Sequence, residues 1–193
     1  MAAVVIAICG VLFILVMVIL VWIVLYNRLA RARNGCQESW SDIQTELKRR
    51  YDLIPNIVKT VKAYAKHERD LLNELTRLRE DCLKATGKPS DQQGPEQAFE
   101  NTLHRLMVRL ENYPDLKASR NYLELQRELS ETEDRIQASL RLYNANVREL
   151  ENLLDTFPSN IVSRVHDFTG YDFFEVGSKE VAQRMQEPPE LDL

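Results

Sequence analysis

The chain has 193 residues, with 25 Lys and Arg against 29 Asp and Glu, a formal charge of −4 and 45% hydrophobic residues. The acidic and basic residues are interleaved and the net charge is negative, so we do not expect a dedicated nucleic-acid-binding protein. The three cysteines, Cys9, Cys36 and Cys82, are too few and too far apart for a disulfide framework or a zinc site, so reduced thiols are expected. Every charged residue lies at or after Arg28, which divides the chain into an apolar segment and a charge-rich domain.

Residues 2–26 are predicted to form a transmembrane helix. The uncharged stretch 2–25 would measure about 36 Å as a helix, which exceeds the roughly 30 Å hydrocarbon core of a bilayer. Trp22 and Tyr26 lie at one end of it, where amphipathic rings prefer the membrane interface. The basic start, short apolar region and small-residue cleavage site of a signal peptide are missing, so we expect an anchor.

The orientation of this single-pass anchor is predicted from its flanks. Arg28, Arg31 and Arg33 follow the apolar stretch, with no acidic residue before Glu38. The positive-inside rule then places the N-terminus outside and the charge-rich domain in the cytoplasm. We therefore expect these arginines, with the two aromatic residues, to anchor the chain at the interface, and the lipid bilayer to be a partner.

The charge-rich domain is predicted to be helical, because Gly and Pro are sparse and long intervals separate them. From Tyr122 to Phe157, mostly apolar residues follow one another at alternating spacings of four and three, with polar interruptions at Gln126 and Glu133. This pattern is typical of a helix that packs against other helices at a shallow angle. A shorter stripe over 99–113 stops before Pro114.

The same spacing runs from Trp40 to Cys82 and keeps its phase through Pro55. Pro55 either kinks one long helix or opens a new helix after a chain reversal, and the continuous phase favours the kink. We predict an all-α fold, in which the transmembrane helix is followed by an antiparallel four-helix bundle over 27–160 with long, coiled-coil-like helices. The expected helices cover approximately 27–52, 54–86, 96–112 and 115–157.

Residues 161–178 form an aromatic C-terminal segment, and residues 179–193 form an acidic tail that is predicted to be disordered. Phe168, Tyr171, Phe173 and Phe174 are candidates for docking a partner. The alternative, which we favour, is that the segment folds back and covers the end of the bundle.

Few residues offer catalytic or metal-binding chemistry. His67 and Glu68 begin a zincin-like motif, but Leu71 occupies the position of its second histidine. Glu68 and Glu133 lie on apolar stripes, where a buried carboxylate is either functional or paired with an arginine. We therefore predict no enzyme, no catalytic residue, no metal and no cofactor.

Several motifs carry a family resemblance that covers nearly all of residues 26–176. They are WSDI at 40–43, LKRRYDLIPN at 47–56, ENYPDLK at 111–117, FPSN at 157–160 and FFE at 173–175. In order and spacing the chain resembles the LemA family of bacterial membrane-anchored proteins. Cys36 and Ser39 stand where the family pattern suggests Val and Ala, a difference that affects packing more than role.

The resemblance implies a membrane-tethered antiparallel helical bundle at the bacterial cytoplasmic membrane, usually with the N-terminus outside, and no established enzymatic activity. Members are often encoded beside membrane proteases and linked to envelope stress, and some relatives organise internal membranes. The expected function is thus a non-enzymatic scaffold or adaptor that acts by self-association, as a homo-oligomer, and by presenting partners. The alternative is a regulatory subunit of a membrane protease or signalling complex.

Overall fold

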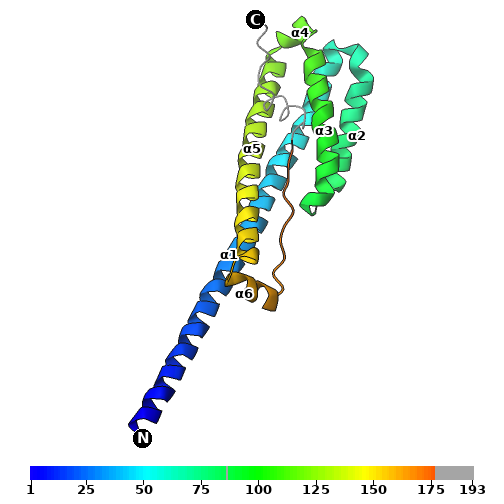
Figure 1. Ribbon diagram of the computed structural model, residues 1–193. Helices are drawn as coiled ribbons and strands as arrows, with labels where there is room; N and C mark the ends of the chain where they lie inside the picture. Colours follow the sequence, from blue (N-terminus) through cyan, green and yellow to red (C-terminus); the bar gives the residue numbers. More distant parts are fainter. Residues whose placement is uncertain (86, 177–193) are drawn as a thin grey trace, which may run out of the picture. The chain divides into compact units, whose positions relative to one another are not determined.

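The computed structural model describes residues 1–85 and 87–176. These residues form helices and no strand, which confirms the predicted all-α class. The predicted acidic tail at 179–193 lies outside the described residues. The elements, in chain order, are α1 (Ala2–Tyr64), the 3₁₀ turn η1 (Lys66–Glu68), α2 (Arg69–Lys84), α3 (Pro89–Leu110), α4 (Pro114–Lys117), α5 (Arg120–Asp155) and α6 (Ser159–Val165) (Figure 1).

Helix α1 is a single helix of 63 residues that passes through Pro55, so the expected helices at 27–52 and 54–86 are wrong in their boundaries. Proline has no N–H, and the carbonyl four residues earlier, that of Tyr51, loses its helical donor. Arg79 replaces that donor, because its Nε donates to the Tyr51 carbonyl oxygen at 2.7 Å. The chain reverses instead after Ala65, through the 3₁₀ turn that precedes α2.

Two other boundaries differ from the expectation. Helix α3 begins at Pro89, seven residues before the expected start at 96, because proline is well suited to the first turn of a helix. The helix expected at 115–157 is divided: Pro114 opens the short helix α4, whose Leu116 is fully buried, and α5 begins only at Arg120. In the aromatic segment, residues up to Val165 belong to α6, and the rest of its described part is irregular.

The chain divides into two compact units, and α1 and α5 each contribute to both. The first unit comprises Met1–Ser39 and Leu142–Asp172, and the second comprises Trp40–Arg141 and Phe173–Leu193. In the second unit, α2 and α3 lie side by side (Figure 1). Its core consists of apolar stripes from four helices, among them Ile43, Leu47, Ile54, Ile57, Val61, Leu72, Leu75, Cys82, Phe99, Leu106, Leu110, Tyr122, Leu129, Ile136 and Leu140.

The predicted stripe on α5 is confirmed in this core. Tyr122, Leu129 and Ile136 are buried, whereas the polar member Gln126 is exposed. The helix therefore uses its apolar face within the chain, as the narrow stripe of a packed amphipathic helix does.

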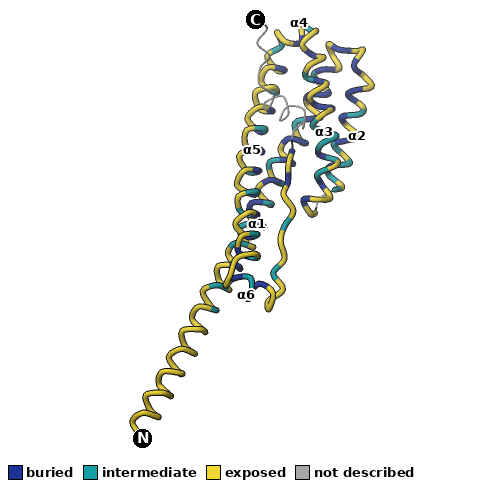
Figure 2. The backbone as a smooth tube through the Cα atoms, viewed as in Figure 1, coloured by how far each residue is buried: buried dark blue, intermediate teal, exposed yellow. Residues whose placement is uncertain are grey.

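The first unit contains the apolar start of α1. Large side chains from Val4 to Val24, except that of the half-buried Trp22, are exposed, and Figure 2 shows most of this part of the helix as exposed residues. By length and composition α1 is able to cross a membrane, and its apolar window has no buried residue. A helix of this kind has no partner for its apolar side chains in water, which agrees with the predicted transmembrane helix.

Candidate functional site

An aromatic cluster forms where the apolar part of α1 ends. Trp22 and Tyr26 lie one helical turn apart, so their rings share a face. The indole Nε1 of Trp22 donates to Nε2 of His166 at 3.3 Å. The Tyr26 ring meets His166 and Phe168 edge-on, with centroids 4.8 Å and 5.7 Å away. We call these four residues the collar, because they tie the returning C-terminal segment to α1.

The arginines that follow the anchor behave differently from one another. Arg33 places its guanidinium carbon 5.2 Å from the centroid of the Phe168 ring, a cation–π contact that joins it to the collar. Nε of Arg31 donates to the carbonyl of Asn27 at 3.3 Å, and both Arg31 and Arg28 stay exposed. Their role as interface anchors, like that of Trp22 and Tyr26, stays a prediction.

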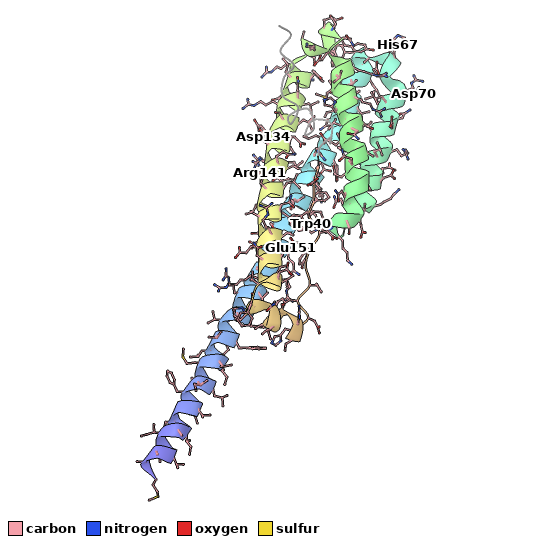
Figure 3. All side chains as sticks on the ribbon, in the orientation of Figure 1. Trp40, His67, Asp70, Asp134, Arg141 and Glu151 are labelled. Carbon is pink, nitrogen blue, oxygen red and sulfur yellow. The ribbon has the colours of Figure 1, made fainter. Side chains whose placement is uncertain are left out.

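The aromatic segment folds back onto the chain. In the first unit, Phe168 belongs to the collar and the Tyr171 hydroxyl accepts a hydrogen bond from Nε2 of Gln37 at 2.9 Å. In the second unit, Phe174 is fully buried and meets Trp40 edge-on at 5.0 Å. Figure 3 marks Trp40 on α1.

Burial decides which of these aromatic residues remain accessible. Phe174 is fully buried in this structure, because its ring packs against Trp40 and its apolar surface is removed from water; docking through it stays a prediction that would need the segment to move. Phe173 keeps 38% of its surface exposed. Docking through Phe168, Tyr171 and Phe173 stays a prediction.

A small polar contact joins α1 and α5 in the first unit. Nδ2 of Asn146 donates to the carbonyl of Gly35 at 3.0 Å and to Oγ of Ser39 at 3.1 Å, while the Ser39 hydroxyl donates back to Gly35 at 2.7 Å. Tyr143, one turn earlier on α5, donates its hydroxyl to the carbonyl of Asp172 at 2.7 Å. Asn146 was not predicted as a contact residue, because its only signal in the sequence is an amide beside the apolar stripe.

The neighbouring Cys36 is fully buried, and burial, with a smaller contribution from Glu149, raises the pKa of its thiol to about 11. Ser39 takes part in the polar contact through its hydroxyl, which also lies 3.2 Å from the carbonyl oxygen of Cys36 and donates to it. Cys36 is a poor nucleophile here, since the thiolate is the reactive form.

The second unit contains a buried ion cluster centred on Arg50, whose side chain is fully buried. Its Nη1 donates to Oε2 of Glu100 at 2.7 Å and to Oε2 of Glu133 at 2.8 Å, and its Nη2 donates to Glu96. Glu96, itself fully buried, also accepts a hydrogen bond from the Tyr51 hydroxyl. One cation thus satisfies carboxylates from α3 and α5 and connects both helices to α1.

The protonation equilibria of the cluster follow from burial and charge. Burial lowers the pKa of Arg50, but the carboxylates of Glu96, Glu100 and Glu133 more than offset this effect and leave the pKa above its ordinary value. Burial raises the pKa of Glu100; Arg50 opposes the rise, and the nearby carboxylates add to it. The cluster therefore keeps its cation, and the pKa of the Glu100 carboxyl lies above its ordinary value.

The suspected carboxylates are both paired with arginine. Glu133 binds Arg50, and Glu68 accepts from Nη1 of Arg109 at 3.0 Å and from the hydroxyl of Tyr113 at 3.2 Å. This confirms the interpretation that a carboxylate on an apolar stripe bonds an arginine. Arg50 lies within the periodic stretch from Trp40 to Cys82, but that spacing does not indicate its partners, because they come from distant parts of the chain.

The described residues contain no group of three or more His, Cys, Asp or Glu side chains that could hold a metal ion. His67 and Asp70 are exposed near the start of α2 (Figure 3), whereas Leu71 points into the core. The described residues therefore form an apolar helix long enough to span a membrane, the collar at the end of its apolar part, and a bundle whose helices are connected by ion pairs.

The motifs and this helical architecture agree with a comparison against known families, in which the model of the LemA family matches residues 39–191. The chain belongs to the LemA family. It is similar to Protein LemA of Metamycoplasma hominis, with 29% identity over 157 residues that cover 80% of this chain and 70% of the relative. It is also similar to the magnetosome protein MamQ of Magnetospirillum gryphiswaldense, with 22% identity over 174 residues that cover 77% of this chain and 64% of the relative.

Proposed function

We propose that this LemA-family protein is a membrane-anchored, non-enzymatic scaffold or adaptor at the bacterial cytoplasmic membrane. The observation that carries the proposal is the continuity of α1, which runs from Ala2 to Tyr64 without a break and leaves its first part exposed and apolar. The apolar start of α1 and the part that packs in the bundle thus belong to the same helix. Tethering of this kind raises the effective concentration of the bundle for any partner in the same membrane.

The proposed orientation places the N-terminus outside and the domain in the cytoplasm. Its support is the row of exposed arginines at 28, 31 and 33 that follows the anchor. A C-terminal tag should resist protease in intact cells and be digested in inverted membrane vesicles. Digestion in intact cells would refute the orientation, and release of the protein by carbonate washing would refute the anchor.

Self-association is the second part of the proposal, and the packing limits where it occurs. The stripes on α1 and α5 are buried within one chain, so they are not free to pair with another copy. The exposed anchor remains as the surface on which copies meet. Mass photometry of the full chain in mild detergent should show oligomers that increase with protein concentration, whereas a monomer at every concentration would refute self-association.

The non-enzymatic part of the proposal is supported by the pairing of the candidate carboxylates. Glu68, Glu96 and Glu133 each contact an arginine, and an ion-paired carboxylate is a weak general base. Metal analysis of the purified full chain, by inductively coupled plasma mass spectrometry, tests this part. A stoichiometric bound transition metal would refute it.

The alternative function, a regulatory subunit of a membrane protease or signalling complex, needs the aromatic segment to reach a partner. Burial of Phe174 and the collar contacts of Phe168 count against it. Replacing the exposed Phe173 by serine separates the two functions. Loss of a co-purifying membrane protease in Phe173→Ser, with unchanged helicity, would favour the regulatory subunit over the scaffold.

A further inference from the structure

An apolar groove lies between the anchor and the segment that leads into α6. One wall is formed by Met17, Val21 and Leu25 of α1, and the other by Phe157, Pro158 and Ile161. The groove has a volume of about 450 Å³ and is lined by apolar side chains, with the Trp22 indole as the polar exception. All of these residues belong to the first unit.

Helix α6 has two different faces. Ser159, Val162 and Ser163 are buried, while the opposite face exposes Ile161, at 48%, and Val165, at 61%, beside Arg164. Phe157, just before the helix, is 79% exposed. Ile161 and Val165 are four apart within α6, so they share one face of the helix, and Ile161 lines the groove together with Phe157.

The position of the groove along the anchor helix indicates whether it lies in the hydrocarbon core or at the membrane interface. Met17 lies about 7 Å along the helix from Trp22, at 1.5 Å per residue, on the side of the apolar segment. If Trp22 marks the interface, one wall of the groove lies in hydrocarbon, and the opposite wall, Phe157 and Ile161, lies at the same depth. Apart from the Trp22 indole, water in a groove lined in this way would have no polar partner.

Cationic residues border the other side of the same segment. A second hollow shares Leu25, Phe157 and Pro158 with the groove and is lined by Arg28 and Arg148, together with Glu149. An apolar slot beside a predominantly cationic hollow matches an amphiphile with a long acyl chain and an anionic headgroup. Interfacial helices use this combination of apolar and basic residues to bind membranes.

We propose that Phe157 and α6 form a second membrane contact, inserted into the bilayer beside the anchor, and that the groove is filled by an acyl chain of a membrane phospholipid. This inference rests on the proposed anchor. The anchor holds α6 at the membrane, so even a helix of seven residues inserts without binding the membrane by itself. The contact would also restrict rotation of the rest of the first unit about the axis of the anchor helix.

Site-specific fluorescence in vesicles tests the inference with the full chain. In a Cys9→Ala background, where the remaining native thiols are buried, single cysteines are introduced as Ile161→Cys and Val165→Cys and labelled with a polarity-sensitive dye. Leu142→Cys is the matched control, because Leu142 is similarly exposed, at 54%, but belongs to α5 well before α6. Ile14→Cys reports on the anchor itself.

In vesicles of phosphatidylcholine and phosphatidylglycerol with nitroxide-labelled acyl chains, emission from positions 161 and 165 should fall at least by half, and emission from position 142 should not change. Quenching at position 14 without quenching at 161 and 165 would overturn the α6 contact and leave the anchor intact. Absence of quenching at position 14 would overturn the proposed anchor and the contact together.

A second measurement identifies the occupant of the groove. Phospholipids with a photoreactive acyl chain should form adducts in the segment 157–162, detected by mass spectrometry of the full chain. Efficient oxidation of Ile161→Cys to a disulfide-linked dimer, with no lipid adduct, would place a second copy in the groove and overturn the lipid assignment.

Discussion

Replacing Arg50 by methionine should strongly destabilise the bundle while leaving its apolar volume nearly unchanged. The guanidinium is fully buried and contacts Glu96, Glu100 and Glu133, of which Glu96 is also fully buried. Removing one partner of a buried pair leaves uncompensated charge, which costs about 3–5 kcal/mol. That is a large part of the total stability of a typical domain, about 5–15 kcal/mol.

The measurement is urea unfolding of the full chain in mild detergent at pH 8, followed by circular dichroism at 222 nm. Arg50→Lys is the matched control: it keeps the charge, but a single ammonium does not reproduce the two-nitrogen contacts of the guanidinium, so its loss should be intermediate. Adding Glu96→Gln to Arg50→Met removes the most buried negative charge and should restore part of the stability. The loss in Arg50→Met should also shrink as the pH falls, because the abandoned carboxylates take up protons.

Two results would refute the reasoning about the cluster. One is a wild-type unfolding midpoint for Arg50→Met at pH 8. The other is a double variant, Arg50→Met with Glu96→Gln, that is less stable than Arg50→Met alone, since this would show that the Glu96 charge does not cause the loss.

Three further predictions concern other parts of the chain. Because the pKa of Glu100 is raised in the folded state, its contribution favours folding most below its ordinary value near 4.5 and is lost as the pH rises through the folded value. Glu100→Gln should therefore flatten the fall in stability as the pH rises above 4.5, and equal slopes for both proteins would contradict this. A thiol reagent at pH 8 should leave Cys36 and Cys82 unmodified until urea is added, because both thiols are buried and burial raises the pKa of Cys82 to about 12. Mass spectrometry measures the labelling, and labelling in native buffer would contradict the described burial. Phe174→Ala should lower the free energy of unfolding in urea by about 3–5 kcal/mol, because it deletes a fully buried ring. It should also shift the fluorescence emission of Trp40, which contacts this ring, to the red. An unchanged unfolding midpoint would show that the segment is not docked.

The sequence by itself determined the membrane-sized apolar helix, the helical class and the apolar stripes. These features are local: charge-free length predicts a membrane helix, and alternating spacings of three and four predict a packed helical face. The burial of Tyr122, Leu129 and Ile136 follows directly from such spacing. The resemblance of the motifs to the LemA family also required only the order of residues along the chain.

The tertiary structure alone decided how the chain passes Pro55 and what Arg50 does. Both depend on residues far away in sequence: Arg79 supplies the donor that Pro55 lacks, and Glu96, Glu100 and Glu133 neutralise Arg50. The spacing of residues along the chain does not predict these contacts. It predicts that a position is buried, but not which distant residue neutralises a charge that is buried there. The collar is of the same kind, since Trp22 and His166 meet only after the chain has folded back.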